Sequence, residues 1–298
     1  MATSAQLAPT RTVASPLALW HLLSLDAPTV ATLWTWFVAR ANHVRLPFAS
    51  IAAMALAVWV LYAADRLLDS RILDTYSRSG RMLQELEARH YFHHRHRRTF
   101  LIGMACAVAT LAARLPTLPA VAIRLYLIEG ALLFAWFLIL HGTHSAHRLP
   151  KEIAVGLFFA AAIFIPTVSR APFAASPVLR LALVPAALLF AALCSLNCLF
   201  IYAWEHEAPG HTPRRQPHPS TRLALRHLTA LALGIAVAAT ALTLFKRLSL
   251  WPIAAACTVS ALLLLFLDRN RRRLPQTTLR AAADLALLTP LALLPFLR

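Results

Sequence analysis

Nine long apolar stretches leave this chain few choices of fold, because each is close to the length of a membrane-spanning helix. Such a helix needs about 20 consecutive apolar residues. In the 298 residues the stretches cover 17–39, 46–68, 98–115, 119–141, 150–169, 178–204, 222–245, 249–267 and 278–297. A mean hydropathy of +0.62 is too high for a soluble domain. The sequence predicts an all-α polytopic membrane protein with about nine transmembrane helices in one bundle, a single domain over residues 1–298 that begins with a disordered tail, residues 1–16.

Positive charge is unevenly distributed between the loops on the two sides of the predicted bundle. Of the 29 Lys and Arg residues, 20 lie in the N-terminal tail and in the loops after the even-numbered stretches. Positively charged loops stay in the cytoplasm. We therefore expect a cytoplasmic N-terminus, a C-terminus outside, and a location in a bacterial inner membrane. The same rule accounts for the net charge of +17, so no nucleic-acid partner is expected.

Two aspartates close the second apolar stretch. Asp65 and Asp69 are four residues apart, which places them one turn from each other on the same face of a helix. Carboxylate oxygens are the ligands that Mg²⁺ prefers, and a Mg²⁺ ion held in this way keeps positions for water or a substrate phosphate. The alternative is a solvated helix end at which Arg66 and Arg71 neutralise the acids.

A second polar group closes the sixth stretch, four helices after the first. It contains Asn197 and Glu205, followed by Glu207. Because both groups are predicted at the cytoplasmic face, the recurrence indicates a weak internal duplication with one site shared between the two halves. Acids that face each other across a cytoplasmic-side polar cavity are suited to hold Mg²⁺ ions that clamp a diphosphate.

With these two groups and about nine spans, the chain resembles the UbiA-type superfamily of intramembrane prenyltransferases. Members of that superfamily have nine transmembrane helices, with aspartate-rich motifs after the second and the sixth. The segment from Asp65 through Arg66 to Asp69 matches half of the first motif, Asn-x-x-x-Asp-x-x-x-Asp. Shorter matches lie at residues 26–34 and 150–156.

The chain departs from the superfamily pattern at several positions. Leu61 stands where the first motif has Asn. The three Asp positions of the second motif hold Asn197, Ile201 and Glu205. The Tyr/Lys motif that follows the fourth helix in the superfamily has no clear equivalent. In that loop the chain carries His141, His144, His147 and Arg148.

The resemblance implies an Mg²⁺-dependent transferase that moves an isoprenyl group from its diphosphate to an aromatic or other hydrophobic acceptor, reached from membrane lipid. Asp65 and Asp69 would be catalytic and would hold Mg²⁺ together with Asn197 and Glu205. Four basic residues are candidates for binding the diphosphate: Arg66, Arg71, His144 and Arg148. The aromatic faces of Tyr62 and Tyr202 would stabilise the allylic cation that forms as the diphosphate leaves.

Two other functions remain open at this point. One is a UbiA-like membrane protein that has lost catalysis and serves as a lipid-binding or accessory protein. The other is a membrane metalloenzyme, because His90, His93 and His94 have the H-x-x-H-H spacing found in membrane di-iron enzymes. Four arginines lie close to these histidines, and a basic helix in contact with anionic lipid headgroups is the simpler interpretation.

Three acids lie inside apolar stretches, where an unpaired charge costs about 2.5–3.5 kcal/mol on insertion scales. They are Asp26, Glu129 and Asp284. Asp26 either lines the acceptor pocket or caps a helix break before Pro28. Asp284 follows Arg280 by one turn, so a pair within the helix is expected there.

Overall fold

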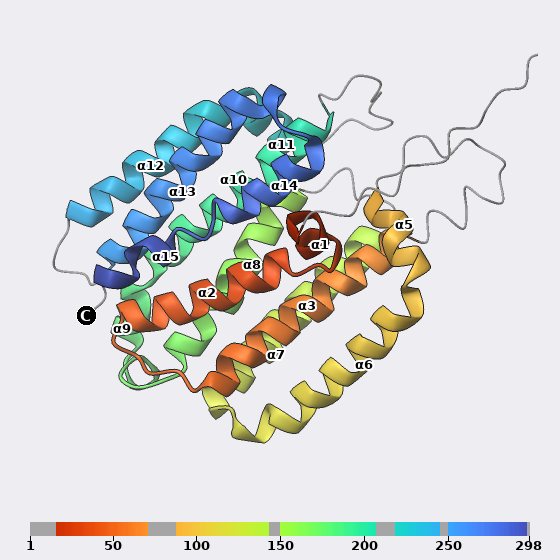
Figure 1. The fold of residues 1–298 in the computed structure, drawn as a ribbon. Helices are drawn as coiled ribbons and strands as arrows, with labels where there is room; N and C mark the ends of the chain where they lie inside the picture. The colour runs from red at the N-terminus through yellow and green to blue at the C-terminus, as the bar shows by residue number, and fades with distance from the viewer. Residues whose placement is uncertain (1–15, 71–87, 143–149, 207–217, 245–249, 297–298) are drawn as a thin grey trace, which may run out of the picture.

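The computed structural model describes residues 16–70, 88–142, 150–206, 218–244 and 250–296, and within these ranges the regular elements are all helices (Figure 1). The longer helices are α2 (Asp26–Ala41), α3 (Phe48–Ser70), α6 (Arg97–Arg114), α7 (Ala120–Gly142), α8 (Lys151–Val168), α10 (Val184–His206), α12 (Leu228–Leu244) and α13 (Trp251–Asn270). The shorter ones are α1 (Pro16–Leu22), α5 (Ala88–Arg95), α9 (Pro177–Ala182), α11 (Pro219–Arg226), α14 (Gln276–Leu285) and α15 (Pro290–Leu293). The predicted all-α class is confirmed for these residues.

Seven segments of the described chain are long and apolar enough to cross a membrane: Phe48–Leu68, Arg97–Thr117, Ala120–Ile139, Lys151–Val168, Pro177–Glu205, Trp251–Arg273 and Thr278–Phe296. An eighth is formed if α11 and α12, which meet at an angle of 80°, are one broken span. The first predicted stretch is not one continuous helix. It breaks after α1 and continues as α2, which has 16 residues.

The helix α2 lies inside the bundle. It contacts α3, α8, α13, α14 and α15, and most of its residues are buried. The helix α10 is the second central element and packs against α8, α12, α13 and α14. At the periphery, α6 contacts α3 and α7 contacts α8, and both expose long apolar faces. Apolar faces of this size are expected to meet lipid tails.

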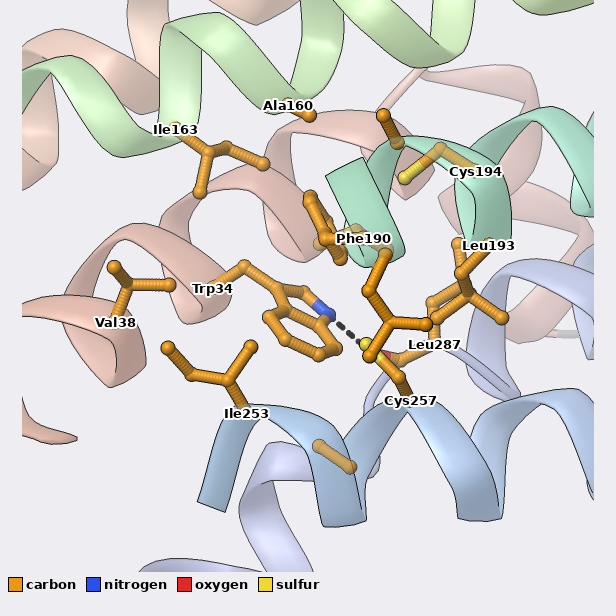
Figure 2. Close-up of a cluster of buried hydrophobic side chains, with 14 of the residues drawn as sticks. Trp34, Val38, Ala160, Ile163, Phe190, Leu193, Cys194, Ile253, Cys257 and Leu287 are labelled. Atoms are coloured by element: carbon orange, nitrogen blue, oxygen red, sulfur yellow. Dashed lines mark hydrogen bonds between the residues drawn. The ribbon is translucent and has the colours of Figure 1, made fainter. Parts of the chain in front are cut away.

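Trp34 is the centre of the core between α2, α10 and α13, as Figure 2 shows. Its indole is fully buried and lies 4.2 Å, centroid to centroid, from the ring of Phe190. The indole N–H donates to the carbonyl of Leu287 at 2.7 Å. Because a buried N–H needs a partner, this hydrogen bond fixes α2 against the segment between α14 and α15.

The close approach of α8 to α10 depends on Gly156. A Cβ atom at this position would lie 2.5 Å from the backbone oxygen of Ala191 and 2.1 Å from Oγ of Ser195. The missing side chain therefore permits the two helices to pack with their backbones close together, as small residues do at helix interfaces in membranes.

Candidate functional site

Polar side chains from several helices are in contact at one end of the bundle. The helices α1, α5 and α11 lie at the same end (Figure 1). At this end α3 and α10 finish, while α2 and α14 begin. The two predicted acid groups, which close α3 and α10, therefore share one end of the molecule. This end is the polar end of the bundle.

Asp26 occupies the first position of α2 and is 2% exposed. The break before it contains Ser24, whose φ of 57° is unusual for a residue other than glycine. This turn brings His21 back to Asp26, with its Nδ1 atom 2.7 Å from Oδ2. The Asp26 carboxylate also accepts from Arg66 Nη2 at 3.3 Å and, through Oδ1, from the N–H of Ala27 at 3.0 Å. The helix break expected before Pro28 is therefore present, and Asp26 lies directly after it.

Asp284 of α14 lies close to His21 and Asp26. It accepts a hydrogen bond at 3.1 Å from Nδ2 of Asn197, a residue of α10. One ligand atom each from His21, Asp26 and Asp284 lie within 4.8 Å of one another. These contacts form one buried polar cluster, which consists of His21, Asp26, Arg66, Asn197 and Asp284.

Outside this cluster, ion pairs and hydrogen bonds connect the ends of α10, α13 and α14. Arg280 of α14 is ion-paired with Glu205 of α10. Asp268 of α13 accepts from Trp204 Nε1 at 2.9 Å and from Arg271 Nη1 at 2.7 Å. Arg280 therefore has a partner on another helix, and the pair with Asp284 within α14 that the spacing indicated stays a prediction.

The residues of the first acid motif have different surroundings. Asp65 is exposed, whereas the neighbouring Arg66 turns inward to Asp26. The Asp69 side chain lies outside the described part of the structure, as do the whole of Arg71, His144 and Arg148. Whether Asp65 and Asp69 share a metal ion therefore stays a prediction.

The two polar residues of the second motif are in contact with α14. Asn197 donates to Asp284, and Glu205 is paired with Arg280. Asn197 Oδ1 is buried and has no hydrogen-bond partner among the described residues. Of these two residues, only Asn197 belongs to the buried polar cluster.

The two tyrosines predicted to face a cation lie at different depths. Tyr62 packs partly buried against the core and is within electrostatic reach of Asp26 and Asp284. Tyr202 is less enclosed and lies near Glu152. Of the two tyrosines, Tyr62 is therefore the one that lies near Asp26 and Asp284 of the buried polar cluster.

The histidines of the H-x-x-H-H string do not share one environment. His93 is buried, with its Nε2 atom 3.2 Å from Oγ of Ser24 and its ring 4.5 Å from that of Phe100. His94 is exposed, and the side chain of His90 lies outside the described residues. Over the described residues, the one group of three potential metal ligands within reach of each other does not include these histidines.

His21 is the member of the cluster that sequence reasoning missed. It lies in an apolar context five residues before Asp26, and the turn at Ser24 alone makes the two side chains neighbours. Asp26 and Asp284 could be found from the sequence, because acids in apolar stretches are costly unless they have partners.

We compared the chain with known protein families, curated proteins and solved structures, and none of them matches.

Proposed function

We propose that this protein is an Mg²⁺-dependent intramembrane transferase that moves an isoprenyl group from its diphosphate to a hydrophobic acceptor. One observation carries the proposal. The helices α3 and α10, which contain the two predicted acid motifs, finish at the polar end of the bundle, where α10 packs against α14. A substrate with a charged head and an apolar tail fits such a boundary, because the head meets polar groups while the tail stays among apolar helices.

Arg66 is the residue best suited to the diphosphate head. Its side chain is 10% exposed, and its Nη2 atom is bonded to Asp26. The Nε and Nη1 atoms are buried without hydrogen-bond partners in the described chain. Guanidinium donors of this kind form strong paired bonds to phosphate oxygens, so two donors are available for the substrate.

Asp65 and Asp69 are the residues that would hold Mg²⁺, and the ion would neutralise charge on the leaving diphosphate. Asp65 is exposed near the end of α3, and Asn197 offers a buried amide oxygen. The ring of Tyr62 lies beside the cluster, where a cation formed from the isoprenyl group gains stabilisation from an aromatic face.

A lipid-binding or accessory protein is the second candidate. The observation that favours it is the pairing of Asn197 with Asp284 and of Glu205 with Arg280. Because Asp284 and Arg280 already bind these two residues, the second motif offers fewer free ligands for Mg²⁺ than a complete acid motif would. A protein of this kind would bind the lipid without Mg²⁺ and would not transfer it.

The experiment is binding of a non-hydrolysable isoprenyl diphosphate analogue to the purified full-length protein, with Mg²⁺ or with a chelator. The test variant is Asp65→Asn/Asp69→Asn, and Glu129→Gln in α7 is the matched control. For the transferase, removal of the aspartates or of Mg²⁺ weakens binding at least tenfold, about 1.4 kcal/mol, and the control binds like wild type.

Equal, weak binding by wild type and the aspartate variant contradicts the transferase proposal. Tight binding that requires neither Mg²⁺ nor the aspartates supports the accessory protein instead. A catalytic assay with labelled isoprenyl diphosphate and membrane lipid then shows whether bound substrate is transferred.

A further inference from the structure

Three side chains of metal-binding type converge at the inner end of the buried polar cluster. They come from elements far apart in the sequence: His21 from α1, Asp26 from the start of α2, and Asp284 from α14. Their nearest ligand atoms all lie within 4.8 Å of one another. His21 is 7% exposed and Asp26 is 2% exposed, and Asp284 is partly buried, so bulk water screens the charge of Asp26 only weakly.

The charges in this group do not cancel if His21 is neutral. Two carboxylates at short range in a weakly polarisable interior repel each other, which favours binding of a proton or a cation. Arg66 offsets the charge of Asp26. Asp284 receives a hydrogen bond from the neutral amide of Asn197, and Arg280, the nearest arginine in its own helix, is ion-paired with Glu205.

The side chain of Asn197 supplies an independent observation. It is 5% exposed, its Nδ2 atom donates to Asp284, and its Oδ1 atom is buried without a hydrogen-bond partner in the described chain. A buried amide oxygen without a partner is rare in folded proteins. Because Nδ2 of the same amide lies 3.1 Å from Asp284, Oδ1 is a candidate for a fourth ligand atom besides the imidazole and the two carboxylates.

We propose that His21, Asp26 and Asp284, with Asn197 Oδ1, bind one transition-metal dication such as Zn²⁺ or Mn²⁺. Imidazole nitrogen together with carboxylate oxygen suits these ions, whereas Mg²⁺ prefers oxygen ligands throughout. Metal binding requires neutral His21, which exchanges its hydrogen bond with Asp26 for coordination. The site uses neither Asp65 nor Asp69 and does not depend on the proposed function; Asn197 is the one residue that is a predicted ligand in both.

Such an ion would connect α1 and α2, near the start of the described chain, to α14 near its end. His21 and Asp26 flank the turn between α1 and α2, and Asp284 lies in α14. The contact between α1 and α14 is already present. A metal ion at their junction would hold α1 in place over the buried polar cluster.

The test is titration of chelator-treated, full-length protein with Co²⁺, which reports its ligands by visible absorption. Wild type should bind one ion per chain. His21→Gln and Asp284→Asn, which nearly conserve side-chain volume, should bind at least tenfold more weakly. Asp268→Asn, at the same end of the bundle but outside the cluster, should bind like wild type, and excess Mg²⁺ should not displace Co²⁺.

A second measurement needs no variant and so does not depend on whether the variants fold. Electron spin-echo spectroscopy of Mn²⁺ bound to wild type should detect one histidine nitrogen coupled to the metal. Three results would each overturn the proposal: no saturable Co²⁺ binding, equal binding by wild type and the two cluster variants, or Mn²⁺ without a coupled nitrogen. The cluster would then share a proton instead of a metal ion.

The two proposals fail independently. The variant Asp65→Asn/Asp69→Asn should keep the Co²⁺ spectrum even where it loses the diphosphate analogue. Loss of the spectrum in that variant would contradict a separate site.

Discussion

Trp34 and Asp26 show how single residues of α2 fix the interior of this protein. Both are almost fully buried, and each directs polar atoms to defined partners: Trp34 to the Leu287 carbonyl, and Asp26 to His21, Arg66 and the N–H of Ala27. Burial of polar groups is tolerated because these partners replace water.

At this scale we predict that Trp34→Phe lowers the free energy of unfolding by about 1–3 kcal/mol. The substitution removes the donor and leaves the Leu287 carbonyl buried without its partner. Unfolding in mixed detergent micelles measures the change. Trp251→Phe is the control, since Trp251 is 39% exposed, and an equal loss in both variants would contradict the role of the hydrogen bond.

At the scale of the helices, close packing and cross-helix ion pairs set the position of α10. Gly156 lets α8 approach it, and the Arg280–Glu205 pair connects it to α14. Since α10 also contains Asn197, both contacts determine how the buried polar cluster is assembled.

Gly156→Ala should destabilise the protein by about 1–3 kcal/mol, because the new methyl group collides with the backbone of α10. Gly234→Ala in α12 is the matched control, since a Cβ there meets nothing within 4 Å. Without a collision, alanine in a helix is favoured over glycine by up to about 1 kcal/mol. Thermal unfolding of both variants compares them, and similar shifts would show that the helices can separate freely.

The Arg280–Glu205 pair should show strong coupling in a double-mutant cycle. Arg280→Met leaves Glu205 without its ion partner and should cost about 3 kcal/mol, while Arg280→Met/Glu205→Met should recover most of that loss. Additive losses in the two single variants would rule out an energetic coupling. Analogue binding by the stable double variant separates a structural role of Glu205 from the predicted role in holding Mg²⁺.

At the scale of the whole molecule, the exposed apolar faces of α6 and α7 are suited to contact with lipid tails. Seven described segments meet the length of a span, and α11 with α12 adds an eighth. Neither α1 nor α2 reaches that length alone. The 16 residues of α2 are about 24 Å long, against a hydrocarbon core of about 30 Å.

We predict that α1 and α2 cross together as a ninth span, with the N-terminus in the cytoplasm and the C-terminus outside. The excess of arginine in the tail and the loops after even-numbered stretches is the reason. Fusions of reporters that are active on one side only, placed at each terminus, test this. Both termini on the same side would mean that α1 and α2 do not cross.

The sequence alone determined the class of fold. In lipid the backbone must satisfy its own hydrogen bonds, so long apolar stretches of this kind form helices whatever their neighbours are. The same argument identified Asp26 and Asp284, because a charge inside such a stretch needs a partner. It also identified the ends of α3 and α10 as polar, since Asp65, Asn197 and Glu205 follow from position in the chain.

The tertiary structure decided which of these groups meet. Asn197 and Asp284 are 87 residues apart in the chain, and nothing in the periodicity of either helix specifies that their faces meet. His21 became a neighbour of Asp26 through the backbone turn at Ser24. An apolar pattern determines the length and face of each helix, whereas the pairing of faces depends on packing between helices, such as the contact that Gly156 allows.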